Sequence, residues 1–167
     1  MSVRLASALV AIVTGLGVAT TAGAHVAGST VRPFVSALEL APEDPSPGGQ
    51  FVWLYNPSGV TIDFGCYRLR STSRAFVVRP QTRVPAHSTV TFAPPRAWLR
   101  SPDQVELLNR AGRVVDRTPR LSDDAHDGQF WLKRPATEWH FGVGRTYGEE
   151  VVRGKIAAAA LESCKVN

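Results

Sequence analysis

Three carboxylates and an imidazole lie within one short stretch of the chain. Asp123, Asp124 and Asp127 surround His126, and Gly128 follows as a turn residue. Oxygen ligands spaced this closely in a loop are typical of Ca²⁺ sites, but the EF-hand spacing D-x-[DN]-x-[DN]-G is absent. A solvated turn explains the same composition. We therefore expect no bound metal, and the three aspartates are the candidate ligands should one bind.

Five arginines are the candidates for binding an anion. Arg68 and Arg70 stand two positions apart, which places both on one face of a strand. Arg74 follows them closely, and Arg110 and Arg113 belong to a later hairpin. Guanidinium groups here could meet phosphate or an acidic glycan, and an ordinary solvated face is the alternative. Because aromatic residues are not interleaved for base stacking, nucleic acid is a weakly supported partner.

The sequence points to no catalytic residue, and we expect neither an enzyme nor a cofactor. The histidines are scattered, and none of the serines lies in a G-x-S-x-G nucleophile elbow. A copper site at the mature amino end is a separate possibility, because His25 would begin the chain after cleavage behind Ala24. The four histidines are His25, His87, His126 and His140.

The first residues read as a cleaved signal peptide over 1–24. An arginine precedes an apolar run of roughly sixteen residues, which falls short of the about 20 that a membrane span needs. Thr21-Ala22-Gly23-Ala24 then fits the small-residue rule for cleavage. We therefore expect a protein that is secreted or on the cell surface, with no membrane span after cleavage. The mature chain would carry 18 basic and 14 acidic residues, a net charge of +4.

The chain has two cysteines, Cys66 and Cys164. In an oxidising compartment an even pair predicts a disulfide. Such a bridge closes a loop of about a hundred residues, which in the chain-entropy model contributes roughly 4 kcal/mol. Two separately buried thiols are the alternative.

A series of short strands positions these residues. Runs of apolar and alternating residues separated by turns, with no helical pattern before residue 145, predict an all-β antiparallel sandwich of immunoglobulin-like type. In 60–69 the period of two places Cys66 on the apolar side, and in 34–40 it places Glu39 between Leu38 and Leu40 on a half-buried strand. Gly112 supplies the positive φ of a hairpin loop. The predicted strands are 34–40, 51–55, 60–69, 75–78, 88–92, 104–109, 113–116 and 129–133.

The chain divides into a short linker over 25–30, one sandwich domain over 31–134 and an extension over 135–167. Within the extension we expect a helix at about 148–164, with acidic residues at its start, four alanines in a row and lysine at its end. Gly154 weakens that pattern. The predicted disulfide would hold this helix against the sandwich.

Four segments of the domain resemble the lamin tail domain, an immunoglobulin-like sandwich. The run from Gln50 to Asn56 is similar to the family's E-[FY]-V-E-L-x-N strand, and that from Asp63 to Leu69 to its D-L-S-G-W-x-L strand. Residues 103–116 resemble its G-D-x-V-x-L-x-N-x-x-G-x-x-V-D hairpin, and 128–135 its closing S-W-x-R strand.

The chain departs from the lamin-tail pattern at four places. Gln50 and Trp53 stand where acidic residues are usual, Cys66 where glycine is usual and Tyr67 where tryptophan is usual. The resemblance implies a non-catalytic binding module whose partner is a protein or an acidic surface polymer. A small secreted hydrolase, an accessory subunit of a nuclease or phosphoesterase, and a purely structural envelope protein are the alternatives.

Overall fold

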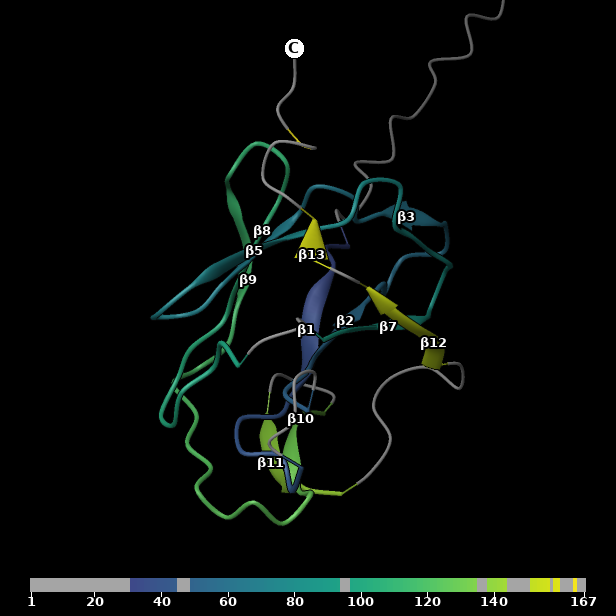
Figure 1. Ribbon diagram of the computed structural model, residues 1–167. Coiled ribbons are helices and arrows are strands. Elements are labelled where there is room, and N and C mark those ends of the chain that lie inside the picture. Colours follow the sequence, from purple (N-terminus) through teal and green to yellow (C-terminus); the bar gives the residue numbers. More distant parts are fainter. Residues whose placement is uncertain are drawn as a thin grey trace, which may run out of the picture.

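The described part of the chain is built from β-strands. The computed structural model describes residues 31–44, 49–93, 97–134, 138–143, 151–156, 158–159 and 164. For 151–156 and 158–159 it describes the backbone alone. Its elements are the strands β1 to β13, and these residues contain no α-helix (Figure 1). The predicted all-β class is confirmed. The predicted signal peptide and the linker over 25–30 lie outside the described residues.

One sheet has six strands in the order β11-β10-β1-β2-β7-β12. Its neighbours pair antiparallel except β12, which runs parallel to β7. The apolar run predicted over 51–55 forms the strand β2 between β1 and β7, with Val52 and Leu54 fully buried and Trp53 partly buried. The six strands are β1 (Phe34–Leu38), β2 (Val52–Tyr55), β7 (Thr89–Phe92), β10 (Phe130–Lys133), β11 (Trp139–Gly142) and β12 (Val151–Ile156).

The second sheet has five antiparallel strands in the order β13-β5-β4-β8-β9, and β3 pairs with β6 as a small ribbon. The predicted hairpin is confirmed as β8 and β9, and Gly112 in its turn has a φ of 75°. These strands are β3 (Ile62–Asp63), β4 (Arg68–Arg70), β5 (Ala75–Val78), β6 (Arg83–Val84), β8 (Glu106–Leu108), β9 (Val114–Arg117) and β13 (Ala158–Ala159).

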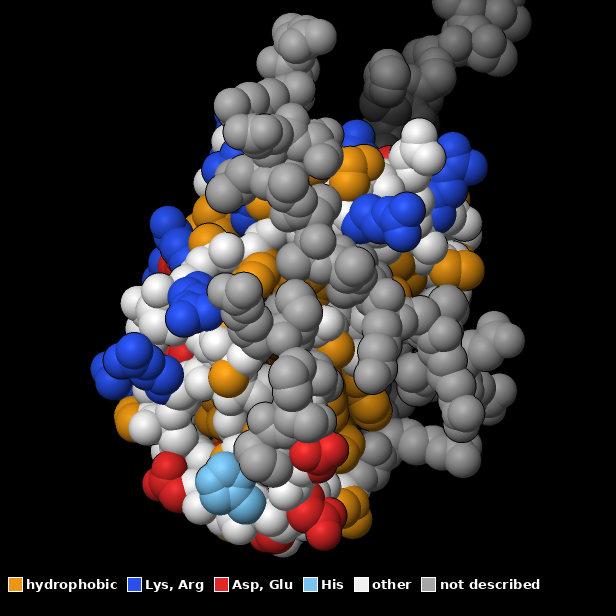
Figure 2. All heavy atoms as spheres, viewed as in Figure 1, with side chains coloured by type: hydrophobic (Ala, Val, Ile, Leu, Met, Phe, Trp, Pro, Cys, Tyr) orange, Lys and Arg blue, Asp and Glu red, His pale blue; other side chains and the backbone are white. Residues whose placement is uncertain are grey.

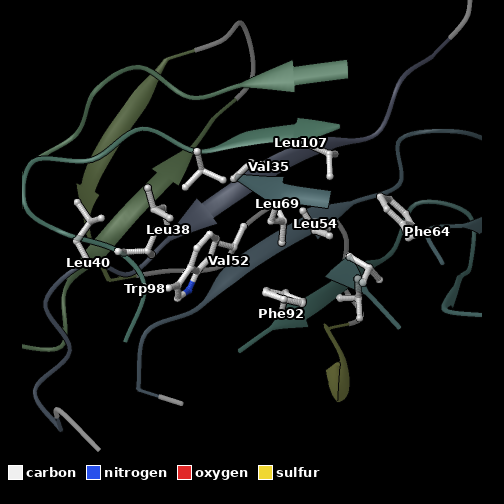
Figure 3. Packing of buried hydrophobic residues seen from close by; sticks show 14 of the residues in the cluster. Val35, Leu38, Leu40, Val52, Leu54, Phe64, Leu69, Phe92, Trp98 and Leu107 are labelled. Atoms are coloured by element: carbon white, nitrogen blue, oxygen red, sulfur yellow. The ribbon is translucent and has the colours of Figure 1, made fainter. Parts of the chain in front are cut away.

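Alternate residues of the two sheets meet in one core. Leu69 of β4 and Leu107 of β8 are fully buried and belong to one cluster with Leu54 of β2 and Phe92 of β7 (Figure 3). Trp98, from the loop after β7, fills the same core with its ring 6.0 Å from that of Phe92. Burying each of these side chains contributes about 2–3 kcal/mol. The two sheets therefore form the predicted sandwich.

Residues 60–69 form two short strands in place of the single strand predicted. β3 ends at Asp63 and β4 begins at Arg68, and Cys66 between them has a φ of 64°. A residue with a Cβ in this left-handed region cannot continue a strand, so the alternation is interrupted there. The turn stays attached to the sheet, because the Cys66 N–H donates a 2.9 Å hydrogen bond to the Val78 carbonyl.

The helix predicted at about 148–164 is wrong where the structure describes this range. Residues 151–156 form β12 along β7, and 158–159 form β13 along β5. Val151, Val152 and Ile156 are β-branched and favour strand, and Gly154 costs helix stability. The edges of β7 and β5 also offer backbone hydrogen bonds to a strand at this place. Both sheets therefore extend beyond residue 134, where we had placed the domain boundary.

Candidate functional site

Two strands, β4 and β9, place arginines on the outer face of the five-stranded sheet. In β4, Leu69 is buried in the core, while Arg68 and Arg70 on either side of it are exposed. The register puts Arg70 opposite Glu106 of β8, and Glu106 opposite Arg117 of β9. Directly opposed residues of an antiparallel ladder share a face. We call Arg68, Arg70, Glu106 and Arg117 the arginine face.

Glu106 holds the two arginines beside it in fixed positions. Arg70 Nε donates to Glu106 Oε2 at 2.6 Å, and Arg117 Nε donates to Glu106 Oε1 at 2.9 Å. Burial alone would raise the pKa of Glu106, but the hydrogen bonds and charges of Arg70 and Arg117 outweigh it and hold this pKa below its usual value. The carboxylate is therefore ionised at neutral pH. Because the arginine face carries three guanidinium groups and this one carboxylate, it is positive.

The five arginines predicted as anion ligands are not one cluster. Arg68 pairs with Leu108, so the turn after Leu108, with Arg110 and Arg113, lies where β4 begins. Arg74 belongs to the turn after β4, at the opposite end of that strand. The structure therefore joins Arg68 and Arg70 with Arg117, which the sequence had not singled out. Figure 2 shows basic side chains over the left of the view, where Figure 1 places β5, β8 and β9, and acidic ones at the lower end.

The acidic loop uses its carboxylates for local hydrogen bonds. Asp123 Oδ1 accepts from the Ala125 N–H at 3.0 Å, and Asp127 accepts from both the backbone and the side chain of Gln129. Asp124 is exposed. Across the described residues, no three His, Cys, Asp or Glu side chains are grouped so that they could hold a metal ion. Asp124 and Asp127 are solvated, whereas Asp123 is only 5% exposed and its Oδ2 is buried without a hydrogen-bond partner among the described residues.

Glu39 has an environment that the sequence did not indicate. We expected it on a half-buried strand, but it follows β1 and is 3% exposed. The pKa of Glu39 is raised to about 7. Burial is the main cause and the charges of Asp123 and Asp127 add to it, while the hydrogen bond from the Ala41 N–H, at 3.0 Å, and the charge of His126 act in the opposite direction. Glu39 is thus a buried acid that titrates near neutral pH. The sequence did not indicate this environment because the acidic loop that lies beside Glu39 is more than eighty residues away along the chain.

The described histidines lie in three separate places. His87 is in the turn before β7, His126 in the acidic loop and His140 in β11. A ring nitrogen of His126 lies 3.0 Å from the Pro42 carbonyl, and His140 Nε2 lies 3.5 Å from Glu138 Oε2. The structure does not bring these three imidazoles together. The copper site proposed at His25 lies outside the described residues.

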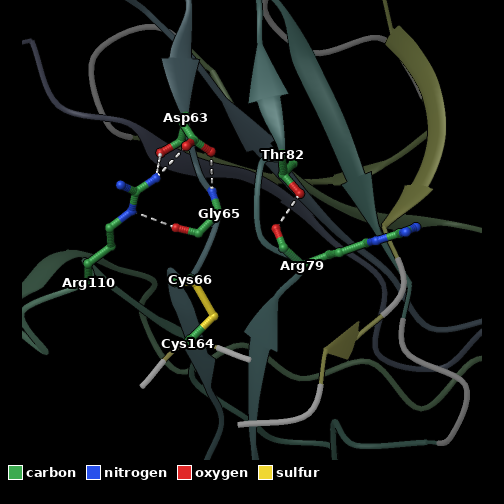
Figure 4. A network of polar contacts seen from close by, with 7 residues as sticks. All are labelled: Asp63, Gly65, Cys66, Arg79, Thr82, Arg110 and Cys164. Carbon is green, nitrogen blue, oxygen red and sulfur yellow. Dashed lines mark hydrogen bonds and ion pairs between the residues drawn. A yellow bond between two sulfur atoms is a disulfide. The ribbon is translucent and has the colours of Figure 1, made fainter. Parts of the chain in front are cut away.

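The disulfide predicted from the cysteine count is present. Cys66 and Cys164 are bonded, with their Cα atoms 5.4 Å apart (Figure 4). Tyr67, next to Cys66 in the chain, contributes to an open cavity of about 350 Å³. The residues that line this cavity are Asp63, Tyr67, Asn109, Arg110 and Ala111.

No family model and no curated protein matches this chain. Among the described residues there is also no helix with the length and apolar character needed to cross a membrane.

Proposed function

We propose that this chain is an exported, non-catalytic binding module of lamin-tail type that engages an anionic component of the cell envelope, a protein or an acidic polymer. The observation that carries the proposal is the arginine face, where Arg70 and Arg117 flank the single carboxylate of Glu106 and Arg68 lies two positions along the same strand from Arg70. The side chains of Arg70 and Arg117 remain 53% and 56% exposed despite their ion pairs. Their remaining N–H groups are open to a ligand.

The chemistry of this surface favours carboxylate or phosphate groups. A guanidinium is planar and always charged, and its N–H groups match the oxygens of such anions in pairs. Glu106 reduces the conformational freedom of Arg70 and Arg117 before any ligand arrives, which lowers the entropic cost of binding. The arginine face would therefore bind a polyanion through several weak and salt-sensitive contacts.

Three positions of the lamin-tail pattern, two of them with the residue that the pattern has, support the family proposal through their structural roles. Asn56 is fully buried, and its Nδ2 donates to three backbone carbonyls that join two loops. Asp103 is also fully buried and accepts four hydrogen bonds. Cys66, where the pattern has glycine, has the positive φ that glycine adopts most easily. Each position has a physical reason for the residue that the pattern prefers.

Export is proposed from the amino-terminal segment and is supported by the disulfide. Disulfides persist in oxidising compartments and are rare where thiols are kept reduced. The bond between Cys66 and Cys164 closes a loop with a sequence separation of 98, so it constrains most of the fold.

A binding experiment with matched charge variants tests the proposal. The purified, disulfide-bonded chain would be incubated with an envelope fraction of the producing cells at low and at high salt. We expect retention at low salt that is lost in the variant R68Q/R70Q/R117Q and at high salt. The control R32Q/R83Q/R134Q removes the same charge at exposed positions away from the arginine face and should be retained.

Two results would overturn this function. No retention of the unmodified chain would exclude an envelope ligand. Retention that withstands both high salt and the loss of the three arginines would instead favour the structural envelope protein.

A further inference from the structure

The cavity beside the disulfide lies at one end of the sandwich, where the loop after β3 approaches the β8–β9 turn. Asp63 and Tyr67 line it from the first segment, and Asn109, Arg110 and Ala111 line it from the second. Its volume of about 350 Å³ is at the small end of the range for ligand sites. It therefore suits one sugar ring or one amino-acid residue. The cavity shares no lining residue with the arginine face.

Arg110 is fixed in this cavity before any ligand binds. Its Nε donates to the Gly65 carbonyl at 2.8 Å, and its Nη2 donates to Asp63 Oδ2 at 2.5 Å (Figure 4). The side chain is still 52% exposed. No hydrogen bond is made by Nη1 to any part of the chain that the structure describes. Arg110 thus presents a preorganised guanidinium with one nitrogen open to solvent.

Asp63, the acid that lines the cavity, is bonded to the protein through both of its oxygens. Oδ2 accepts from Arg110, and Oδ1 accepts from the Gly65 N–H at 2.8 Å. A Cβ at Gly65 would lie 2.5 Å from the Gln81 backbone nitrogen, so only glycine allows this close approach. The negative charge of Asp63 is therefore engaged by protein donors.

Two more donors line the cavity. Asn109 Oδ1 accepts a hydrogen bond from the Arg113 N–H at 3.0 Å. This bond fixes the orientation of the amide and leaves Nδ2 as the donor for a ligand. Within the described residues, neither Asn109 Nδ2 nor the Tyr67 hydroxyl makes a hydrogen bond. Since the side-chain acceptors of this site are occupied and three donors are open, the cavity presents a surface for a negatively charged group.

We propose that this cavity binds a single carboxylate group through Arg110, Asn109 and Tyr67. A carboxylate fits better than a phosphate dianion because the one guanidinium is already partly neutralised by Asp63. Either a uronic acid of an acidic polysaccharide or the carboxyl end of a peptide supplies this chemistry, and the ring of Tyr67 offers an apolar surface for the group that carries it.

The test is an NMR titration of the ¹⁵N-labelled, disulfide-bonded chain with sodium glucuronate and, separately, with N-acetylglycine. We expect saturable shifts in residues 63–67 and 109–112 with at least one of them, and the tighter ligand identifies the source of the carboxylate. Methyl glucoside, which has no charge, and inorganic phosphate are the comparison ligands and should bind at least about tenfold more weakly.

Variants separate binding from folding. N109D keeps the acceptor for the Arg113 N–H but replaces the open donor with a second negative charge, so the affinity should fall about tenfold or more at unchanged melting temperature. Y67F should lose a few-fold in affinity, and R113Q, at the same turn but outside the cavity lining, should lose none. The absence of saturable shifts, equal binding of methyl glucoside or phosphate, or undiminished binding by N109D would each overturn the proposal.

Discussion

The backbone N–H of Val35 donates a 2.8 Å hydrogen bond to Asp116 Oδ2, so that a side chain of one sheet binds the backbone of the other. The register of β1 on β2 shifts between Val35 and Ala37. Such a bulge leaves a backbone group without its ladder partner. Lys133 of β10 lies 3.6 Å from the same carboxylate, and its charge offsets that of Asp116. This contact holds the open edge of the five-stranded sheet on the six-stranded sheet.

Replacing Asp116 should therefore loosen the sandwich at this edge. D116A leaves the Val35 N–H and Lys133 without their partner and should cost about 2–4 kcal/mol in the free energy of unfolding. D116N keeps an acceptor for Val35 and should cost about half as much. Urea denaturation measures both, with the exposed Asp124→Asn as the control. Equal stability of D116A and the unmodified chain would show that the contact is unimportant.

Gln50 should not tolerate the acidic residue that the lamin-tail pattern has at its position. Its Nε2 donates to the carbonyls of Leu40, at 2.7 Å, and Leu99, at 2.9 Å, and its Oε1 accepts from the N–H groups of Trp98 and Leu99. Q50E would set a carboxylate oxygen against two carbonyls, and we expect a loss of about 2–3 kcal/mol at pH 7. Thermal unfolding checks this, and the exposed Gln81→Glu should cost far less. A stable Q50E would contradict the assigned amide orientation.

Stability should fall with rising pH because of Glu39. The pKa of the Glu39 carboxyl is about 7 in the folded chain, against a reference value of 4.5 that stands for the unfolded chain. The folded state therefore binds the proton more tightly. The protonated carboxyl contributes about 3 kcal/mol to the free energy of unfolding. This contribution is fully present below pH 4.5 and is lost as the pH rises through 7. E39Q should therefore gain stability relative to the unmodified chain between pH 5 and about 8.

Unfolding curves for both proteins at several pH values measure this difference. The exposed Glu43→Gln is the matched control and should show no such trend. A difference between E39Q and the unmodified chain that stays constant across this pH range would rule out the titration of Glu39.

The φ of Cys66 predicts an order of stability among variants that lack the disulfide. Removing the bridge with C66A/C164S should cost about 2–4 kcal/mol. C66G/C164S should be more stable than C66A/C164S by about 1 kcal/mol, because glycine adopts a φ of 64° without the Cβ penalty. Denaturation under non-reducing conditions gives all three values. The reverse order would mean that Cys66 changes its backbone conformation when the bridge is removed.

Local sequence signals predicted the features that depend on neighbouring residues. The β8–β9 hairpin follows from the alternation on either side of Gly112, and β2 follows from the apolar run over 51–55. The disulfide could be predicted because two cysteines allow one intramolecular pairing. In each case the information lies within a few residues or in a simple count.

Features that depend on distant partners were missed. Arg117 joins Arg70 only through the register of three strands, and the pKa of Glu39 is raised by burial and by the carboxylates of a loop more than eighty residues later. The extension over 135–167 is a further example. Its alanines and acidic start favour a helix when considered alone, but in the structure residues 151–156 and 158–159 pair as strands with the edges of β7 and β5. Tertiary contacts override local preference in each of these places.

The position of the last strands has a consequence for biosynthesis. Residues 151–159 supply one strand to each sheet, and Cys164 supplies half of the disulfide. A chain synthesised from its amino end therefore has the edges of β5 and β7 unpaired, and a free thiol at Cys66, until residues 151–164 have emerged. During that interval it is open to wrong strand pairing and to mixed disulfides with other proteins.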